Sequence, residues 1–118
     1  MSAVANNSQL LTRLITAAGL RSKVTSANMA NLNTPGYRRQ VVKFEGELQN
    51  AMQRGSGQTA RIEPTIEEDL ISPARADGNN VTLELEMNTM RENRLLMETY
   101  MTILQSQFGL LETAINGQ

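Results

Sequence analysis

A heptad pattern in the C-terminal third is the feature that most constrains what this chain can fold into. Apolar side chains recur there at alternating steps of four and three residues, and only Arg94 breaks the series. The pattern predicts one helix over residues 81–116, on the order of 50 Å long at ~1.5 Å per residue. Helices with such a seam pack against other helices along their length. The seam consists of Leu83, Met87, Met90, Met97, Met101, Leu104, Phe108, Leu111 and Ile115.

A shorter apolar stripe predicts a second helix over residues 8–33. Its apolar members are Leu11, Ile15, Ala18, Met29 and Leu32, with Ser22 and Thr25 as a polar interruption at the centre. Ser8 is the expected N-cap, because its hydroxyl can accept a hydrogen bond from a free amide of the first turn. Gly19 either marks the close approach of another helix or has no special role.

The middle of the chain, residues 34–80, is rich in turn-forming residues. Pro35 and Gly36 at the centre of four residues predict a type II turn with positive φ at Gly36. A short strand or extended arm is expected over residues 40–44, and a short helix over 45–54.

Further along, Gly55-Ser56-Gly57-Gln58 is typical of a flexible linker. Ile66, Leu70 and Ile71 are the strong apolar anchors expected beyond it. We therefore expect this part of the chain to be weakly ordered, or ordered only by partners.

The predicted fold class is mainly α, with long N- and C-terminal helices packed as a coiled coil around a loop-rich middle. The expected divisions are residues 1–33, 34–80 and 81–118, with the first and last forming one functional domain. The shorter helix cannot cover the whole seam, and each fully buried Leu or Met contributes roughly 1.5–3 kcal/mol. Assembly with other chains is therefore favoured. The alternative is a plain two-helix hairpin that dimerises.

Composition excludes several kinds of chemistry. The chain has no Cys and no His, which removes thiol chemistry, the commonest general base and the commonest metal ligand. Eleven basic against twelve acidic residues give a net charge of -1, so no nucleic-acid partner is expected. The apolar runs are too short for membrane insertion, and the polar Met1–Gln9 segment does not resemble a cleaved signal peptide.

The local clusters of charged residues are interpreted as surface features and not as functional sites. Arg38, Arg39 and Lys43 are interpreted as a solvated turn, and Glu67-Glu68-Asp69 as a solvated acidic patch. Asp77-Gly78-Asn79 lacks the late acidic residue that a calcium loop requires. Glu84 and Glu86 are expected to favour the positive end of the long helix. No catalytic residue, metal site or cofactor is predicted, and an enzyme is the least favoured class.

Residues 27–38 carry the most specific motif: three asparagines, a Thr-Pro-Gly-Tyr turn and a basic residue. Its signature positions are Asn28, Asn31, Asn33, Thr34, Pro35, Gly36 and Tyr37. The motif closely resembles the signature of the flagellar basal-body rod, hook and hook-associated proteins. Residues 78–87 and 108–115 resemble the C-terminal part of B-type rod subunits. The chain also lacks the large inserted middle domain that hook and distal-rod proteins carry.

The resemblance implies a structural subunit of the proximal rod, the shaft between the membrane ring and the distal rod and hook. It implies terminal helices packed near the filament axis and helical stacking of subunits, whose head-to-tail contacts would transmit torque. The implied partners are other rod subunits, basal-body ring and export-gate components, and the type III export apparatus. The implied location is the periplasm-spanning rod of the bacterial flagellum, reached without a cleaved signal peptide.

Two rival interpretations remain: a C-type rod subunit, and a soluble coiled-coil adaptor or export chaperone. The short middle and the 108–115 ending argue against the first, and the Asn-Thr-Pro-Gly-Tyr turn argues against the second. A charge placed at Met101 or Leu104 is predicted to block assembly without preventing expression.

Overall fold

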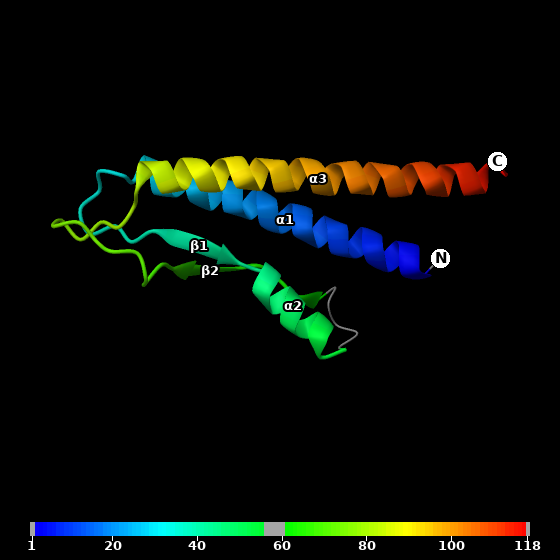
Figure 1. The fold of residues 1–118 in the computed structure, drawn as a ribbon, viewed down its shortest axis with the longest axis horizontal. Helices are drawn as coiled ribbons and strands as arrows, with labels where there is room; N and C mark the ends of the chain where they lie inside the picture. Colours follow the sequence, from blue (N-terminus) through cyan, green and yellow to red (C-terminus); the bar gives the residue numbers. More distant parts are fainter. Residues whose placement is uncertain (1, 56–60, 118) are drawn as a thin grey trace.

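The computed structural model describes residues 2–55 and 61–117 as an elongated molecule measuring 64 × 28 × 14 Å (Figure 1). Most described residues are helical, which confirms the predicted mainly α class. In chain order the elements are α1 (Ser2–Ala30), β1 (Gln40–Lys43), α2 (Glu45–Gln53), β2 (Thr65–Glu68) and α3 (Leu83–Ile115).

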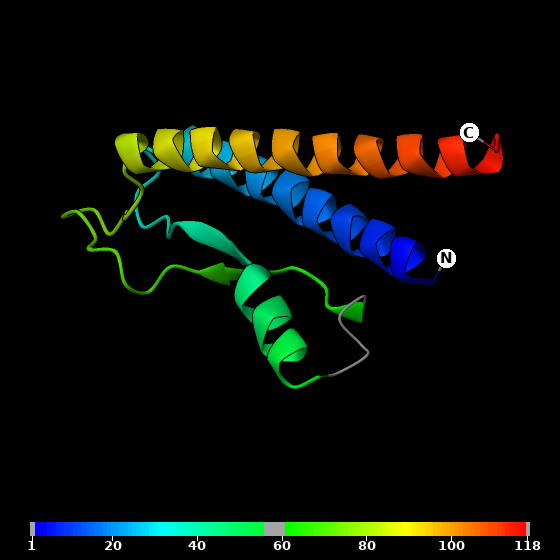
Figure 2. The same cartoon turned by 45° about the vertical axis from the view of Figure 1, so that its right-hand side comes forward.

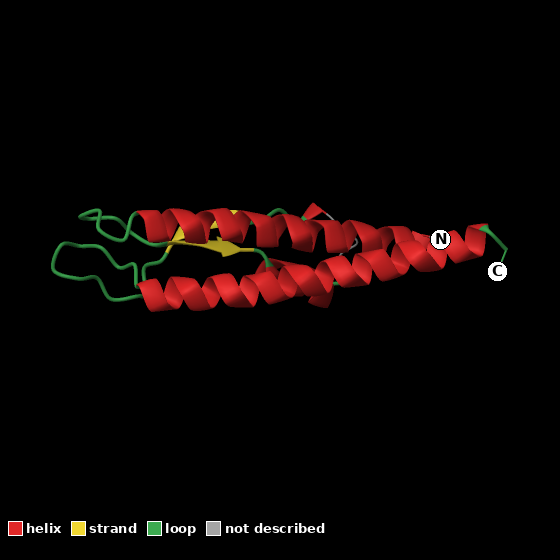
Figure 3. Cartoon of the chain, turned by 90° about the horizontal axis from the view of Figure 1, so that it is seen from above, coloured by secondary structure: helices red, strands yellow, loops and turns green. Residues whose placement is uncertain are grey.

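The two long helices, α1 and α3, run antiparallel and pack side by side (Figures 1 and 3). Both chain termini therefore lie at one end of the molecule, and the loops that connect the helices to the hairpin lie at the other. The long C-terminal helix predicted from the heptad pattern is confirmed, with boundaries within two residues of the expected ones. None of the helices in the described ranges combines the length and the apolarity that crossing a membrane requires.

The N-terminus of α1 differs from the prediction. The helix begins at Ser2, so Ser8 lies inside it and is not its N-cap. The Ser8 hydroxyl instead donates a hydrogen bond to Oε1 of Gln107 on α3, at 3.2 Å. Ala3 and Ala5 favour the longer helix, because alanine has the highest intrinsic helix propensity.

The middle of the chain forms a small β-hairpin and α2, which lie along one side of the helix pair (Figures 1 and 2). β1 and β2 pair antiparallel, with Val42 opposite Ile66. The strand expected near residue 40 and the short helix after it are confirmed. No sequence pattern was strong enough to predict that β1 pairs with β2.

Phe44 anchors the hydrophobic core at the junction of β1 and α2. It is 1% exposed and packs with Ala17 of α1 and Leu48 of α2. Where the structure describes it, the middle of the chain packs on α1 through this junction, and its weak order before assembly stays a prediction. The expected anchors Ile66, Leu70 and Ile71 are instead exposed. Ser56–Gln58 of the predicted linker lie outside the described residues.

Candidate functional site

The heptad seam of α3 is only half covered by α1. Met90, Met97, Leu104 and Leu111, at every second position, are partly buried, whereas Leu83, Met87, Met101, Phe108 and Ile115 are exposed. The positions of α3 that are fully buried are polar, namely Glu86 and Asn93. The seam therefore lies along the edge of the helix pair, and its outer half faces away from the chain's own core.

The matching stripe on α1 is mostly covered. Leu11 and Ala18 are buried, and Ile15, Met29 and Leu32 are partly buried. At Gly19 the helices come close: a Cβ there would meet Cε of Met97 at 3.9 Å. This is ordinary van der Waals contact, so Gly19 marks a helix approach, one of its two interpretations, without requiring glycine.

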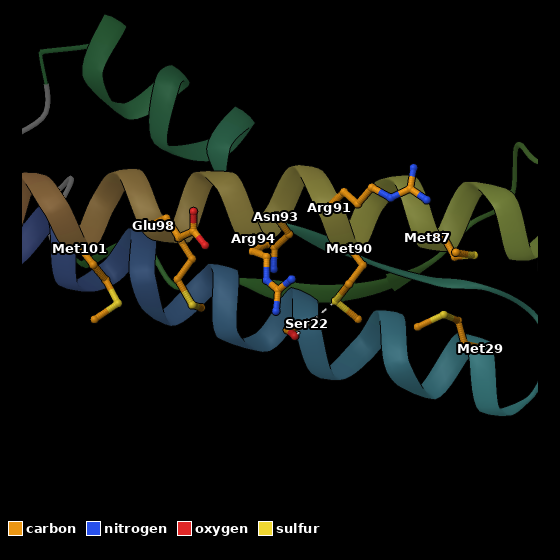
Figure 4. A pocket seen from close by; sticks show the side chains of 10 residues that line it. Ser22, Met29, Met87, Met90, Arg91, Asn93, Arg94, Glu98 and Met101 are labelled. Carbon is orange, nitrogen blue, oxygen red and sulfur yellow. Dashed lines mark hydrogen bonds between the residues drawn. The ribbon is translucent and has the colours of Figure 1, made fainter.

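A groove of about 540 Å³ opens between α1 and α3, and we call it the methionine groove (Figure 4). Its floor and walls are Ser22, Met29, Met87, Met90, Met97 and Met101, and its charged rim is Arg91, Arg94 and Glu98. The Ser22 hydroxyl lies 3.6 Å from the Met90 sulfur. Methionine side chains are flexible and polarisable, so a surface of this kind adapts to an apolar partner.

The predicted turn after α1 is confirmed. The Tyr37 amide donates to the Thr34 carbonyl at 3.2 Å, and Gly36 has φ 74°. The Gly36 amide also donates to the Asp77 carbonyl at 2.8 Å. A Cβ on Gly78 would lie 3.3 Å from Cα of Gly36, so the two glycines allow the turn and the loop before α3 to pack backbone against backbone.

Asn79, which the sequence analysis considered only for a calcium loop, holds the turn that follows α1. Its buried side-chain amide donates to the carbonyls of Asn31, Leu32 and Thr34 at 2.8–3.1 Å. Its Oδ1 accepts from the Val81 amide at 2.7 Å. These three carbonyls belong to the turn after Ala30, so Asn79 ties that turn to the start of α3.

Asn28 of the signature motif joins three parts of the fold. Its amide donates to the Gln40 carbonyl at 2.8 Å and to Glu86 Oε2 at 3.2 Å. Its Oδ1 accepts from the Gln40 amide and the Tyr37 hydroxyl. Asn31 bonds the Ala27 carbonyl at 2.8 Å, whereas Asn33 is exposed. The first two asparagines of the motif thus bond backbone carbonyls.

A buried charged cluster lies beside Asn28. Arg39 of the loop before β1 pairs through Nε with Glu86 of α3 and through an Nη with Asp69, the latter at 3.0 Å. The solvated interpretations of Arg39 and Asp69 were wrong, because each finds a charged partner that is distant in sequence. Glu86 is fully buried, so its role is not limited to the helix dipole.

Hydrogen bonds from the Ser72 side chain and amide, and further bonds from the Ile71 amide and Arg39, hold the pKa of Asp69 well below its ordinary value of 3.8. Burial, and secondarily the charge of Glu86, raises the pKa of Tyr37. The loop after β2 is therefore fastened by an ionised carboxylate.

Asp69→Asn should make folding less sensitive to acid. A carboxyl with a depressed folded pKa contributes stability above its unfolded pKa and loses it as pH falls below that value. We expect the difference in unfolding free energy between wild type and variant to shrink from about pH 5 to pH 2. Urea titrations across this range would measure it, with Glu67→Gln as the exposed control. A wild-type–variant difference that does not change with pH would contradict the assignment.

Comparison with known proteins places these features in a family. A family model described as "Flagella basal body rod protein" matches residues 15–38. The flagellar basal body rod protein FlgB of Salmonella typhimurium is 28% identical over 115 residues, covering 82% of this chain and 83% of its own. FlgB of Borrelia hermsii is 27% identical, covering 87% and 90%. FlgB of Cereibacter sphaeroides is 31% identical, covering 83% and 84%.

These matches extend over most of the chain and include the turn motif. They confirm the resemblance that residues 27–38, 78–87 and 108–115 indicated. The arrangement of two long helices, a braced turn and a half-exposed apolar seam is that of a structural subunit. The chain belongs to the FlgB family of flagellar basal body rod proteins.

Proposed function

We propose that this structural rod subunit assembles helically through the exposed half of the α3 seam and thereby carries torque along the proximal rod. The observation that carries the proposal is the line of exposed apolar residues on a 33-residue helix. α1 leaves this line uncovered, and monomers rarely expose an apolar face of that length. Many parallel helix contacts between copies would resist twisting better than one compact joint.

The buried charged cluster supports a mechanical role. It links α1, the hairpin and α3 through directional bonds at the end where the loops lie. A rotation of one helix relative to the other would break these bonds. We infer that the two helices act as one functional unit and that residues 34–80 brace it.

The proposed partners follow from the family. They are other rod subunits and neighbouring basal-body ring and export-gate components, with the type III export apparatus as the route to the periplasm-spanning rod. The names of the relatives favour a B-type over a C-type rod subunit. A soluble adaptor or chaperone is the alternative outcome of the test below.

The first test is retention of the tagged protein in purified hook–basal bodies after detergent extraction, followed by immunoblot. Retention at the rod supports the proposal. Recovery only as a soluble complex would favour the adaptor or chaperone.

Met101→Asp should abolish retention and motility without lowering expression. Met101 is exposed on the seam, so the charge would enter the subunit contact but not the monomer core. Leu104 is a less clean target, because it is partly buried within the chain. Thr102→Asp adds the same charge to the neighbouring exposed position and should remain motile. Normal swimming of the Met101→Asp strain in soft agar would refute the seam contact.

A further inference from the structure

The loop after β2 presents two large apolar side chains to solvent. Leu70 is 78% exposed and Ile71 is 94% exposed, so they touch little of their own chain. We call this pair the apolar knob. It lies in the loop region at the end of the molecule where α3 begins (Figure 1).

The apolar knob is held in place by its surroundings. Asp69 accepts hydrogen bonds from the amides of Ile71 and Ser72 at 2.9 and 3.0 Å, and it pairs with Arg39. The Asn80 side-chain amide donates to the Asp69 carbonyl at 2.9 Å. These hydrogen bonds and the ion pair between Arg39 and Asp69 fix a turn whose two apolar side chains are exposed to solvent. Such an arrangement is expected of a preorganised contact rather than of a loose loop.

The methionine groove is complementary to this knob in apolarity and in charge. Arg91 and Arg94 on its rim outnumber Glu98, which leaves a positive rim. Glu67 and Glu68, directly before the knob, are exposed on β2 and give it a negative approach. Among the residues that the structure describes, none of four side chains forms an ion pair: Arg91, Arg94, Glu67 and Glu68.

We propose that the apolar knob of one copy seats in the methionine groove of a second copy of this chain, with the negative end of β2, formed by Glu67 and Glu68, beside the positive rim formed by Arg91 and Arg94. The proposal rests on the assembly function above and assigns it a specific contact. Because knob and groove are different surfaces, each bound pair leaves one knob and one groove free. Further copies can therefore add head to tail, which builds a helix or a ring rather than a closed dimer. The charges would set the orientation of the two copies, and burial of the apolar side chains would supply most of the affinity.

Cysteine cross-linking between two distinguishable copies tests the contact, since the natural chain has no Cys. Ile71→Cys on one tagged chain and Met87→Cys on a second, differently sized chain would be co-expressed in cells that lack the natural gene. After mild oxidation, purified basal bodies would be probed for the mixed dimer. Leu110→Cys is the control for Met87→Cys, because Leu110 is also an exposed apolar residue of α3 but lies outside the groove.

The expected result is a mixed dimer with Met87→Cys and none above background with Leu110→Cys. Chains that are retained in basal bodies but give no mixed dimer, or give it equally with both partners, would overturn the contact and leave the rod function standing. If wild-type chain itself is absent from basal bodies, the rod function fails and the contact fails with it.

Charge reversal gives a second, independent measurement. Glu67→Arg with Glu68→Arg should reduce swimming, and adding Arg91→Glu with Arg94→Glu should restore it. All four side chains are exposed, so the monomer fold should be kept, which circular dichroism would verify. Folded variants whose swimming defects simply add, with no restoration in the fourfold variant, would overturn the proposed pairing.

Discussion

Glu86→Ala is expected to destabilise the folded chain by about 3–5 kcal/mol, because it leaves Nε of Arg39 and an amide hydrogen of Asn28 buried without their carboxylate partner. Domains of this size are typically stable by only about 5–15 kcal/mol, so the loss removes a large part of the total. Urea unfolding followed by far-UV circular dichroism would measure it.

The matched control is Glu84→Ala on the same turn of α3. Glu84 is exposed and forms no ion pair among the described residues, so its loss should change the unfolding free energy by less than about 0.5 kcal/mol. Because both changes replace Glu with Ala in one helix, helix propensity cancels. Equal effects of the two substitutions would show that the buried cluster contributes nothing specific.

Phe44→Ala is expected to lower the free energy of unfolding by about 3–5 kcal/mol, since it removes the largest side chain of the core and leaves a cavity. The chain has only two phenylalanines and no tryptophan, so few other large side chains can fill the core. We expect a lower urea midpoint and detachment of α2 from α1. Thermal unfolding by circular dichroism would provide a second measure.

Phe108→Ala provides the contrast. Phe108 is 55% exposed on the outer half of the seam, so its loss should leave monomer stability nearly unchanged while weakening assembly. The two phenylalanines thus separate folding from assembly with one kind of substitution. Equal destabilisation of the monomer by both variants would mean that the seam residue packs inside the chain.

The long helices and the signature turn were predictable because their signals are local. A heptad repeat needs only one face of one helix, and Pro35-Gly36 fixes a turn by its own backbone preferences. The inward positions of α3 were not predictable in the same way. Apolar periodicity points to the seam, yet the side chains that meet α1 most deeply are the polar Glu86 and Asn93.

The buried cluster escaped prediction for a physical reason. Arg39, Asp69 and Glu86 are separated by 30 and 47 residues in their pairs, and each looks like an ordinary surface charge among its neighbours. Burying a charge is favourable only with a well-placed partner, and that partner is defined by the tertiary fold. The role of Asn79 was missed likewise, because the carbonyls that it bonds lie 45–48 residues earlier in the chain.

The cross-helix bonds are unevenly placed, so α1 and α3 are held together more firmly at one end of the molecule than at the other. The bonds made by Asn79, Asn28 and Arg39 lie where α1 ends and α3 begins. Toward the termini, the contacts that the structure describes between α1 and α3 are weaker, such as the hydrogen bond of 3.2 Å between Ser8 and Gln107. A force that pushes α1 and α3 apart would therefore separate their terminal ends more easily than the end where the loops lie.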